Sequence, residues 1–343
     1  MKLDAKVKSG LAVLKANLAG TRTPLSVYLS VTDRCAGRCA YCNIPNRHMP
    51  ELETGQILRM VEGIRDAGGV RLQLLGGEPM LRDDLGEIIR AAKKRGLYVT
   101  LSTTGARVPE RIDELKGVDM IFLSFDGDRP VHDAHKGKGS FDGLMAAMCA
   151  LKKRGIVFST TSLLTRKSGG SVDFILSIAR SLGFSTVFQP LYYTQKTYPD
   201  HFHLPRVGDD LILSGEEYRA IFKRLIHEKK VGAPIASSLK YLETLRDWDD
   251  YTTIYSSRVN KCARCWAGKL YCYIDTNGQM YPCGDSIGVI PGVDVLSNGF
   301  QKAFHDLNVN AACRFCIVAC DLEQNLMFSL NAGTILNWLR YAG

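Results

Sequence analysis

The sequence has no long hydrophobic segment. Its 343 residues contain no run of about eighteen uncharged apolar residues, so no membrane-spanning helix is expected. The first residues also lack the apolar core and cleavage site of a secretory signal, and we therefore expect a cytoplasmic location. With 45% apolar and 23% charged residues, the composition is typical of a globular chain with one large core and a smaller domain.

The sequence also lacks a recognisable nucleic-acid-binding element. Its net charge is +9, but the lysines and arginines are scattered, and the short basic runs 93–95, 152–154 and 229–230 lie near expected helix ends. Cations are favoured there by the helix dipole. No recognition helix or platform of aromatic and basic residues stands out, so no nucleic-acid partner is expected.

The N-terminal segment 1–23 has the pattern of an amphipathic helix. Apolar residues recur there at helical spacing, with lysines among them: Leu3, Val7, Leu11, Leu14 and Leu18. Such a helix either packs on the main domain or lies on a membrane surface. Peripheral membrane contact is therefore one of the two interpretations.

Residues 24–213 alternate between strand and helix patterns, which favours a parallel sheet with outer helices. The six expected strands are Leu25–Val31, Val70–Leu75, Leu97–Ser102, Met120–Ser124, Ile156–Leu163 and Thr186–Gln189. The expected helices are Thr54–Asp66, Asp84–Lys94, Pro109–Leu115, Ser140–Arg154 and Ser171–Ser181. The fold class is thus α/β, a partial (β/α)6 TIM-like barrel, in which ligands bind at the carboxyl ends of the strands. We expect a helical connection at 214–259 and a small cysteine-rich domain with a C-terminal helix at 260–343.

The eleven cysteines are clustered in expected loops. Without a secretory signal, such clusters favour metal or iron–sulfur binding over disulfides. Cys149 is the exception, because it lies within an apolar helical pattern, and it is interpreted as a core residue.

Three of these cysteines, Cys35, Cys39 and Cys42, form a C-x3-C-x2-C run just after the first expected strand. Three thiolates on one loop can hold three corners of a cubic iron–sulfur cluster and leave one iron open for a small molecule. The alternative is a structural zinc site, for which His48 is the nearby candidate fourth ligand.

The second strand runs into Gly76-Gly77-Glu78-Pro79. The glycines allow the backbone to approach a ligand closely, and the carboxylate can accept a hydrogen bond from an ammonium group. The alternative interpretation is an ordinary turn after a strand. Hydroxyl and acidic residues also follow the third and fourth strands, where they could equally be turn or cap residues.

The cysteine run, with Tyr41 before its last cysteine, and the GGEP sequence resemble the signature motifs of the radical S-adenosylmethionine (radical SAM) superfamily. The resemblance implies that Cys35, Cys39 and Cys42 bind a catalytic [4Fe–4S] cluster. The open iron would chelate S-adenosylmethionine, whose reductive cleavage releases a 5′-deoxyadenosyl radical. It also implies cofactor-binding roles for a further set of residues: Tyr41, Gly76, Gly77, Glu78, Ser102, Thr103, Ser124 and Asp126.

A second set of cysteines lies in the last quarter of the chain: Cys262, Cys265, Cys272, Cys283, Cys313, Cys316 and Cys320. Residues 273–281 between them are typical of a β-hairpin with an Asn-Gly turn. A zinc ribbon is one interpretation. The spacing from Cys265 through Gly278 to Cys283 resembles SPASM and twitch extensions, which implies at least one auxiliary [4Fe–4S] cluster. Two ligand sets remain open: Cys265, Cys272, Cys283 and Cys320, or Cys283, Cys313, Cys316 and Cys320.

The substrate is less defined than the chemistry. The segment 124–142 resembles peptide-maturing SPASM enzymes, whereas the N-terminal helix and the compressed last cysteine run resemble adenosylhopane synthase. These resemblances imply a peptide side chain, a lipid or terpenoid precursor or another small molecule as substrate, and an electron donor such as flavodoxin or ferredoxin. The alternative functions are a non-catalytic iron–sulfur electron carrier and a zinc-binding scaffold.

Overall fold

A curved nine-stranded sheet organises the chain in the computed structural model, which describes residues 3–192, 207–248, 250–251, 255–256, 264–309 and 315–341. Its strand order is β10-β9-β8-β1-β2-β3-β4-β5-β6. The strands are β1 (Ser26–Ser30), β2 (Arg71–Leu75), β3 (Tyr98–Thr103), β4 (Met120–Ser124), β5 (Phe158–Leu164), β6 (Thr186–Pro190), β8 (Tyr271–Ile274), β9 (Gln279–Tyr281) and β10 (Val293–Asp294). Strands β1 to β6 are all parallel, which confirms the six predicted strands and the partial barrel.

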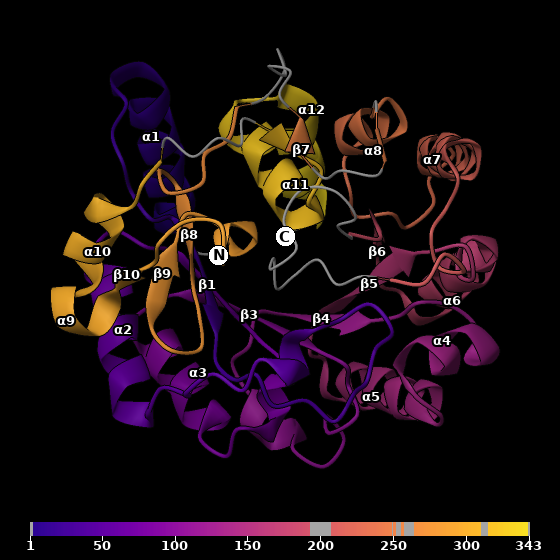
Figure 1. The fold of residues 1–343 in the computed structure, drawn as a ribbon, viewed down its shortest axis with the longest axis horizontal. Coiled ribbons are helices and arrows are strands. Elements are labelled where there is room, and N and C mark those ends of the chain that lie inside the picture. The colour runs from indigo at the N-terminus through magenta and orange to yellow at the C-terminus, as the bar shows by residue number, and fades with distance from the viewer. Residues whose placement is uncertain are drawn as a thin grey trace.

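Helices cover the convex side of the sheet (Figure 1). They are α2 (Thr54–Asp66), α3 (Leu85–Lys94), α4 (Arg129–Lys136), α5 (Ser140–Arg154) and α6 (Val172–Leu182). Alternate strand residues such as Leu72, Leu74 and Leu101 are fully buried in this outer core, while Gln73 and Ser102 face the concave side. Of the predicted helices, Pro109–Leu115 is reduced to the 3-10 turn Ile112–Leu115.

The opening of the curved sheet is filled from above in Figure 1 by the C-terminal helices. The helices that follow β6 are α7 (Gly215–Lys230), α8 (Leu239–Arg246), α9 (Val295–Asn298), α10 (Phe300–Asp306), α11 (Ala319–Phe328) and α12 (Ala332–Tyr341). From α11, Gln324 reaches across to the hydroxyl of Tyr28 on β1. A short pair of strands, β7 (Tyr255–Ser256) and β11 (Phe315–Cys316), completes this part.

The predicted cysteine-rich segment 260–343 is joined to the barrel through its strands. Strand β8 pairs in parallel with β1, so that Val27 lies opposite Cys272, and β8 continues antiparallel into β9. The turn between them is the predicted Asn277-Gly278, where Gly278 has a φ of 82°. Since β8 to β10 extend the barrel sheet, the two predicted domains share one sheet.

The prediction that Cys149 is a core residue is wrong, because the structure leaves it exposed on α5. The buried face of α5 consists of Phe141, Leu144, Met148 and Leu151, which recur three or four residues apart. Position 149 is rotated about 100° from Met148 around the helix axis, and it therefore points away from the core.

Helix α1 (Leu3–Ala19) forms as predicted and packs on the barrel, but with its less apolar side. Val13 and Ala16 are buried, while Leu11 and Leu18 are exposed. Among the described residues, no helix combines the length and the apolar character needed to cross a bilayer.

Candidate active site

The three cysteines of the C-x3-C-x2-C run lie on a loop that leaves the carboxyl end of β1. A Cβ placed on Gly37 would lie 3.5 Å from the Cys35 Sγ and 3.7 Å from the Cys39 Sγ. The Cys42 amide donates to the Cys39 carbonyl, at 3.1 Å, and closes the second half of the loop. Both sulfurs therefore lie beside the same glycine of the loop.

Burial disfavours the charged form of these thiols. It raises the pKa of Cys35 to about 11, and it also raises the pKa of Cys42. Metal binding requires the thiolate. A cation at this position would therefore compensate for a burial cost that the protein alone leaves uncompensated.

The GGEP residues position the stem of the cysteine loop. The amide of Gly77 donates to the Thr32 carbonyl (2.7 Å), and the amide of Glu78 donates to the Arg34 carbonyl (2.8 Å). A Cβ on Gly77 would stand 2.6 Å from the Asp33 carbonyl oxygen, closer than such contacts occur. Only a glycine allows this approach of the two backbones.

Glu78 is buried and bonded within the fold. Its Oε1 accepts from the Thr103 hydroxyl at 2.7 Å, and its Oε2 accepts from the Thr104 hydroxyl at 2.6 Å and the Thr104 amide at 2.8 Å. These bonds join the end of β2 to the end of β3, beside the cysteine loop.

The other strand-end residues predicted for cofactor binding lie on the concave side or at its rim. The Ser102 Oγ accepts from the Gln73 Nε2 at 3.1 Å, and Ser124 ends β4 in a half-buried position. Their roles toward a cofactor stay a prediction.

Tyr41 and Asp126 belong to a buried network that reaches the cysteines. The Tyr41 hydroxyl donates to the Asp126 Oδ2 (2.6 Å), and the Lys136 ammonium donates to the Tyr41 oxygen (2.6 Å). The same ammonium lies 4.0 Å from the Cys39 Sγ and 3.4 Å from the Asp126 Oδ2. The network therefore places one cation directly beside a predicted cluster ligand.

Asp126 stays ionised in spite of its burial. Burial alone would raise the pKa of this carboxyl, but the Lys136 charge, the His135 ring 3.4 Å away and the hydrogen bond from Tyr41 hold it well below its usual value. Correspondingly, although burial opposes its charge, the carboxylate of Asp126 raises the pKa of Lys136. A buried ion pair of this kind provides a fixed charge arrangement under the cysteine loop.

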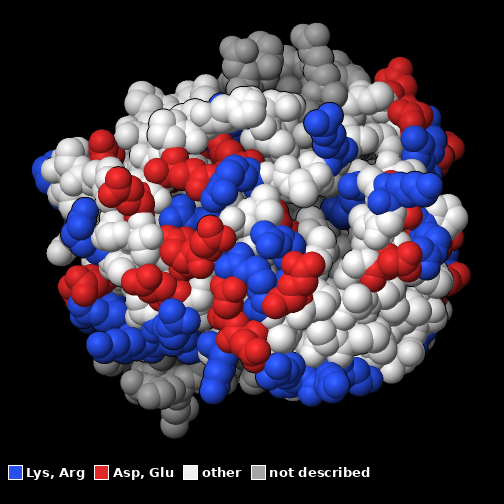
Figure 2. Space-filling view, turned by 90° about the horizontal axis from the view of Figure 1, so that it is seen from below, with Lys and Arg blue, Asp and Glu red and all other residues white. Residues whose placement is uncertain are grey.

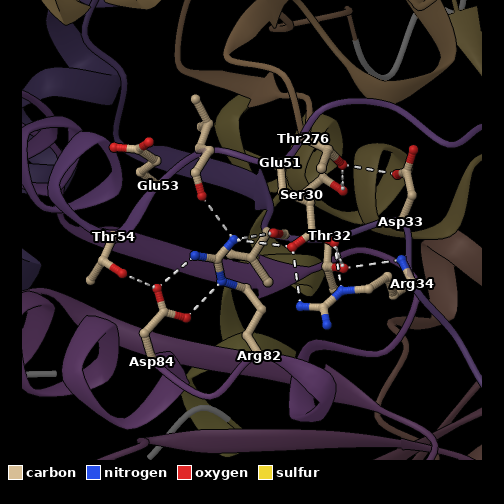
Figure 3. Close-up of polar contacts among 12 residues, drawn as sticks. Ser30, Thr32, Asp33, Arg34, Glu51, Glu53, Thr54, Arg82, Asp84 and Thr276 are labelled. Carbon is tan, nitrogen blue, oxygen red and sulfur yellow. Dashed lines mark hydrogen bonds and ion pairs between the residues drawn. The ribbon is translucent and has the colours of Figure 1, made fainter.

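A buried arginine closes the base of the loop (Figure 3). The Arg82 Nη1 donates to the carbonyls of Val31 (2.9 Å) and Leu52 (3.0 Å), which lie before and after the cysteine loop. Its Nε and Nη2 donate to both oxygens of Asp84, at 2.8 and 2.6 Å. Sequence reasoning missed Arg82, although its position just after GGEP was a usable signal.

The cysteine loop is also tied to the β8–β9 hairpin. Arg47 donates from Nη1 to Asp275 at 3.0 Å and lies 3.5 Å from Asp33, both of which are buried. The Thr276 hydroxyl in turn donates to Asp33 at 2.9 Å, as Figure 3 shows. These contacts link the two cysteine regions through the sheet that they share.

A pocket of about 330 Å³ adjoins the loop. Its lining includes Cys35, Asp33, Arg34, His48 and Glu51. His48, the candidate zinc ligand, is exposed and adopts a positive φ of 50°. The pocket brings a predicted metal ligand within reach of solvent.

A second group of potential metal ligands gathers beside β8. One ligand atom each from Cys283, Asp285 and Asp321 lies within 4.8 Å of the others. The Cys320 Sγ lies 3.7 Å from an Asp321 oxygen. Burial raises the pKa of Cys283, and the charges of Asp321, Asp285 and Cys265 raise it further. Sequence reasoning missed both aspartates.

Burial also disfavours the charged form of the carboxyl groups in this second group. Burial raises the pKa of Asp321 to about 8, with Asp285 adding to it, and raises the pKa of Asp285 itself to about 7. Thiols and carboxyls held together in one buried group are the chemistry of a metal site.

Cys272 does not belong to this group. It lies in the main core with Val27 and Ile274, whereas its strand neighbours Tyr271 and Tyr273 face the core against which Cys265 and Cys283 pack. Successive residues of a strand point to opposite faces, so Cys272 points away from the other cysteines. The predicted ligands Cys262 and Cys313 lie outside the described residues.

A partial α/β barrel with three cysteines on the loop after its first strand, and a further thiol group beside it, defines an iron–sulfur enzyme class. Residues 29–167 match the family model described as the radical SAM superfamily. This match confirms, for that part of the chain, the superfamily that the sequence motifs predicted, and the enzyme prediction with it. The superfamily uses a [4Fe–4S] cluster and S-adenosylmethionine, which confirms these predicted cofactors, and SPASM-type members carry auxiliary clusters.

Among curated proteins, the chain is similar to the PqqA peptide cyclase of Ruegeria pomeroyi, with 34% identity over 168 residues, or 47% of this chain and 45% of that protein. It is 26% identical to the PqqA peptide cyclase of Granulibacter bethesdensis over 76% of this chain and 67% of that protein. It is 25% identical to the AdoMet-dependent heme synthase of Methanosarcina barkeri over 78% of each. The chain thus spans less than half of the first of these relatives.

Solved structures share the fold. Streptococcus suis SuiB bound to S-adenosylmethionine superposes with a TM-score of 0.66 at 14% identity, covering 87% of this chain and 69% of that one. The structure of anSMEcpe with AdoMet and the Cp18Cys peptide gives a TM-score of 0.63 at 17% identity, covering 93% and 88%. Both comparisons support the predicted fold class.

Proposed function

We propose that the chain reductively cleaves S-adenosylmethionine at a [4Fe–4S] cluster held by Cys35, Cys39 and Cys42, and uses the reaction to modify a peptide side chain. The observation that carries the proposal is that the cysteine loop follows the carboxyl end of β1, with the Cys35 and Cys39 sulfurs on either side of Gly37. When bound, the cluster and S-adenosylmethionine supply a one-electron cleavage and a 5′-deoxyadenosyl radical.

The surrounding residues hold the cysteines and set their electrostatics. Arg82 and the GGEP backbone fix the loop at its stem. The Lys136 ammonium, 4.0 Å from the Cys39 Sγ, offsets thiolate charge, and Asp126 keeps that ammonium in place. Glu78, with both oxygens bonded to Thr103 and Thr104, acts by joining the strand ends that border the cofactor.

A peptide is the substrate class that the relatives favour. Two of them are PqqA peptide cyclases, and the anSMEcpe structure with the same fold contains a bound peptide. The alternatives of lipid and terpenoid precursors have no comparable support on this chain. An external one-electron donor such as flavodoxin or ferredoxin is part of the proposal, because the cleavage consumes an electron.

We further propose that one auxiliary cluster is bound by Cys265, Cys283, Cys316 and Cys320. The charges of Cys265, Cys283 and Cys316 all act on the buried Tyr271 hydroxyl, and Cys320 adjoins Asp321 of the same group. One ligand atom each of Asp285 and Asp321 lies within 4.8 Å of the Cys283 sulfur, so both are candidates for an oxygen ligand.

The proposal is tested by replacing Cys35, Cys39 and Cys42 together with alanine, and by comparing the variant with Cys149→Ala, which removes an exposed cysteine on α5. After anaerobic reconstitution and reduction with dithionite, the wild type and Cys149→Ala should convert S-adenosylmethionine into 5′-deoxyadenosine. The triple variant should not, and should lose about four irons per chain. A wild-type protein that binds only zinc and leaves S-adenosylmethionine intact would refute the proposal.

The substrate class needs a separate experiment. Deuterated peptide and lipid extracts are offered to the reconstituted enzyme, and deuterium in 5′-deoxyadenosine reports the source of the abstracted hydrogen. Label from the peptide fraction is expected, and label from the lipid fraction alone would contradict the peptide assignment.

A further inference from the structure

Helix α1 is held on the barrel by its small residues. Val13 and Ala16 are buried in the cluster that contains Leu25, Val70 and Leu270, the residues just before β1, β2 and β8. The Asn17 side chain donates to the Phe328 carbonyl at 2.9 Å. The helix therefore lies across the N-terminal ends of these three strands, with a fixed inner face.

The opposite side of α1 carries its large apolar residues, and they are exposed. The exposed fractions are 54% for Val7, 54% for Leu11, 46% for Leu14 and 83% for Leu18. At about 100° per residue these four positions form one stripe, roughly 180° from Val13 and Ala16. A helix of a globular protein normally buries its widest apolar stripe. In α1 this stripe, here called the leucine stripe, has no partner within the described chain.

Basic residues accompany the leucine stripe. The first twenty residues contain four lysines and one acid, Asp4, and Lys15 is exposed next to Leu11 and Leu14. At the end of the helix, the exposed Arg264 donates to the Ala16 carbonyl at 3.3 Å. Apolar residues flanked by cations are the pattern of a helix that lies in an anionic membrane interface.

The same end of the molecule carries further cations. Helices α3 and α5 run antiparallel to the strands, so their C-termini lie at the strand edge on which α1 packs. Exposed lysines occur there: Lys94, Lys152 and Lys153. Figure 2, which looks onto the helices below the sheet, shows blue side chains along its lower edge. Glu62 and Asp113 at this end pair with Arg95 and Arg154, which leaves these lysines without an ion pair among the described residues.

We propose that this end of the protein docks on an anionic lipid bilayer, with the leucine stripe at the boundary between headgroups and acyl chains and the basic helix ends facing lipid phosphates. Each cation near such a surface adds attraction to the buried apolar area. A second copy of the chain fits less well, because it would bring two lysine-rich helices together.

The proposal has a geometric consequence. The cysteine loop leaves β1 at its carboxyl end, whereas α1 covers the N-terminal end of the same strand. Docking therefore leaves the active site at the far end of the barrel, open to solution, as a peptide substrate needs.

The experiment is co-sedimentation of the full chain with vesicles of phosphatidylcholine and phosphatidylglycerol, and with phosphatidylcholine alone. The variant Leu11→Ser/Leu14→Ser removes the centre of the leucine stripe, and Leu336→Ser, 67% exposed on α12, is the matched control. A third variant, Lys152→Glu/Lys153→Glu, tests the charge contribution.

We expect the wild type to bind the anionic vesicles only, and more weakly at high salt. The leucine variant should bind about tenfold or more weakly, the charge variant about fivefold or more weakly, and Leu336→Ser like the wild type. The proposal is overturned if the wild type stays in the supernatant or if Leu336→Ser loses as much binding. A change from dimer to monomer in the leucine variant, measured by light scattering without vesicles, would assign the stripe to a second copy instead. Sedimentation requires no turnover, so failure here is distinguishable from failure of the proposed chemistry.

Discussion

The two cysteine regions of this chain differ in how their ligands come together. Cys35, Cys39 and Cys42 lie within eight consecutive residues, on one loop. The second group brings Cys265, Cys283 and Cys320 together from the segment before β8, the residues just after β9 and the start of α11. The first arrangement is encoded by spacing, while the second depends on how the strands and helices pack.

Their surroundings differ in the same way. The cysteine loop is closed at its base by charged hydrogen bonds from Arg82 and stands beside the Asp126–Lys136 pair. In the second group, burial raises the pKa of the acids Asp285 and Asp321. We infer that Lys136 offsets part of the thiolate charge at the first site, whereas a bound metal ion would offset the charge of the buried acids and thiols at the second.

The largest expected effect separates the two regions directly. Cys283→Ser removes a ligand of the second group only, because Cys283 lies in the cluster with Asp285 and Asp321. We expect the loss of about four irons per chain, while those bound through the cysteine loop remain. Iron and sulfide analysis with electron paramagnetic resonance of the reduced protein measures both. An unchanged iron content would contradict the assignment of Cys283.

The frame of the cysteine loop is tested by Arg82→Met, which keeps the volume and removes the charge. Asp84 loses its charged donor, and the carbonyls of Val31 and Leu52 lose the donor that Arg82 supplies, so the free energy of unfolding should fall by about 3–5 kcal/mol. Urea denaturation measures this effect. The control is Arg95→Met on the exposed pair with Glu62, which should leave the midpoint unchanged. Equal midpoints for both variants would show that Arg82 does not hold the loop.

Much of the first region was predictable from the sequence, because its signals are local. Strand patterns, the cysteine spacing and the glycines before Glu78 all act within a few residues of one another, and the glycines prove necessary for the approach to the Asp33 and Arg34 carbonyls. What spacing did not indicate is the partner of each polar group. Lys136 lies 94 residues beyond Cys42 and reaches the loop only because α4 packs against it.

The second cysteine region and the surface were less predictable. Whether a residue there is buried depends on which face of its helix or strand packs against the rest of the protein. A shift of one residue along a helix moves a side chain by about 100° around the axis, enough to change it from buried to exposed. Cys149 on α5 is an example, because it is exposed next to the buried Met148. Helix α1 has the apolar period of a packed helix but is held by Val13 and Ala16 on its other face. Both outcomes depend on tertiary contacts that a pattern of apolar residues does not encode.

A smaller effect concerns the pH dependence of the free energy of unfolding, through a buried histidine next to Asp126. Burial lowers the pKa of His132 to about 4, and its Nδ1 accepts a hydrogen bond from the Asp126 amide at 3.2 Å. In the unfolded chain His132 takes up a proton near pH 6.5, whereas in the folded chain it does so only near pH 4. The stabilising contribution of neutral His132 is therefore complete above pH 6.5 and is lost as the pH falls toward 4.

The full contribution of His132 is about 3 kcal/mol across that range. Urea denaturation from pH 7 to pH 4 of the wild type and His132→Gln measures it, because glutamine retains an acceptor but does not titrate. The variant should show the shallower decline. Parallel pH profiles would mean that other groups set the acid sensitivity.

The smallest expected effect sharpens the boundary between the two regions. Cys272 is fully buried in the main core on the opposite face of β8 from Tyr271 and Tyr273. Cys272→Ser should therefore cost about 1–3 kcal/mol of stability through a buried hydroxyl, with the iron content unchanged. Cys272→Ala, which introduces no polar atom, is the control for the hydroxyl. Successive side chains of β8 point to opposite faces, so one cluster cannot be reached from both. A loss of iron from Cys272→Ser, like that expected for Cys283→Ser, would therefore contradict the placement of Cys272 in the main core.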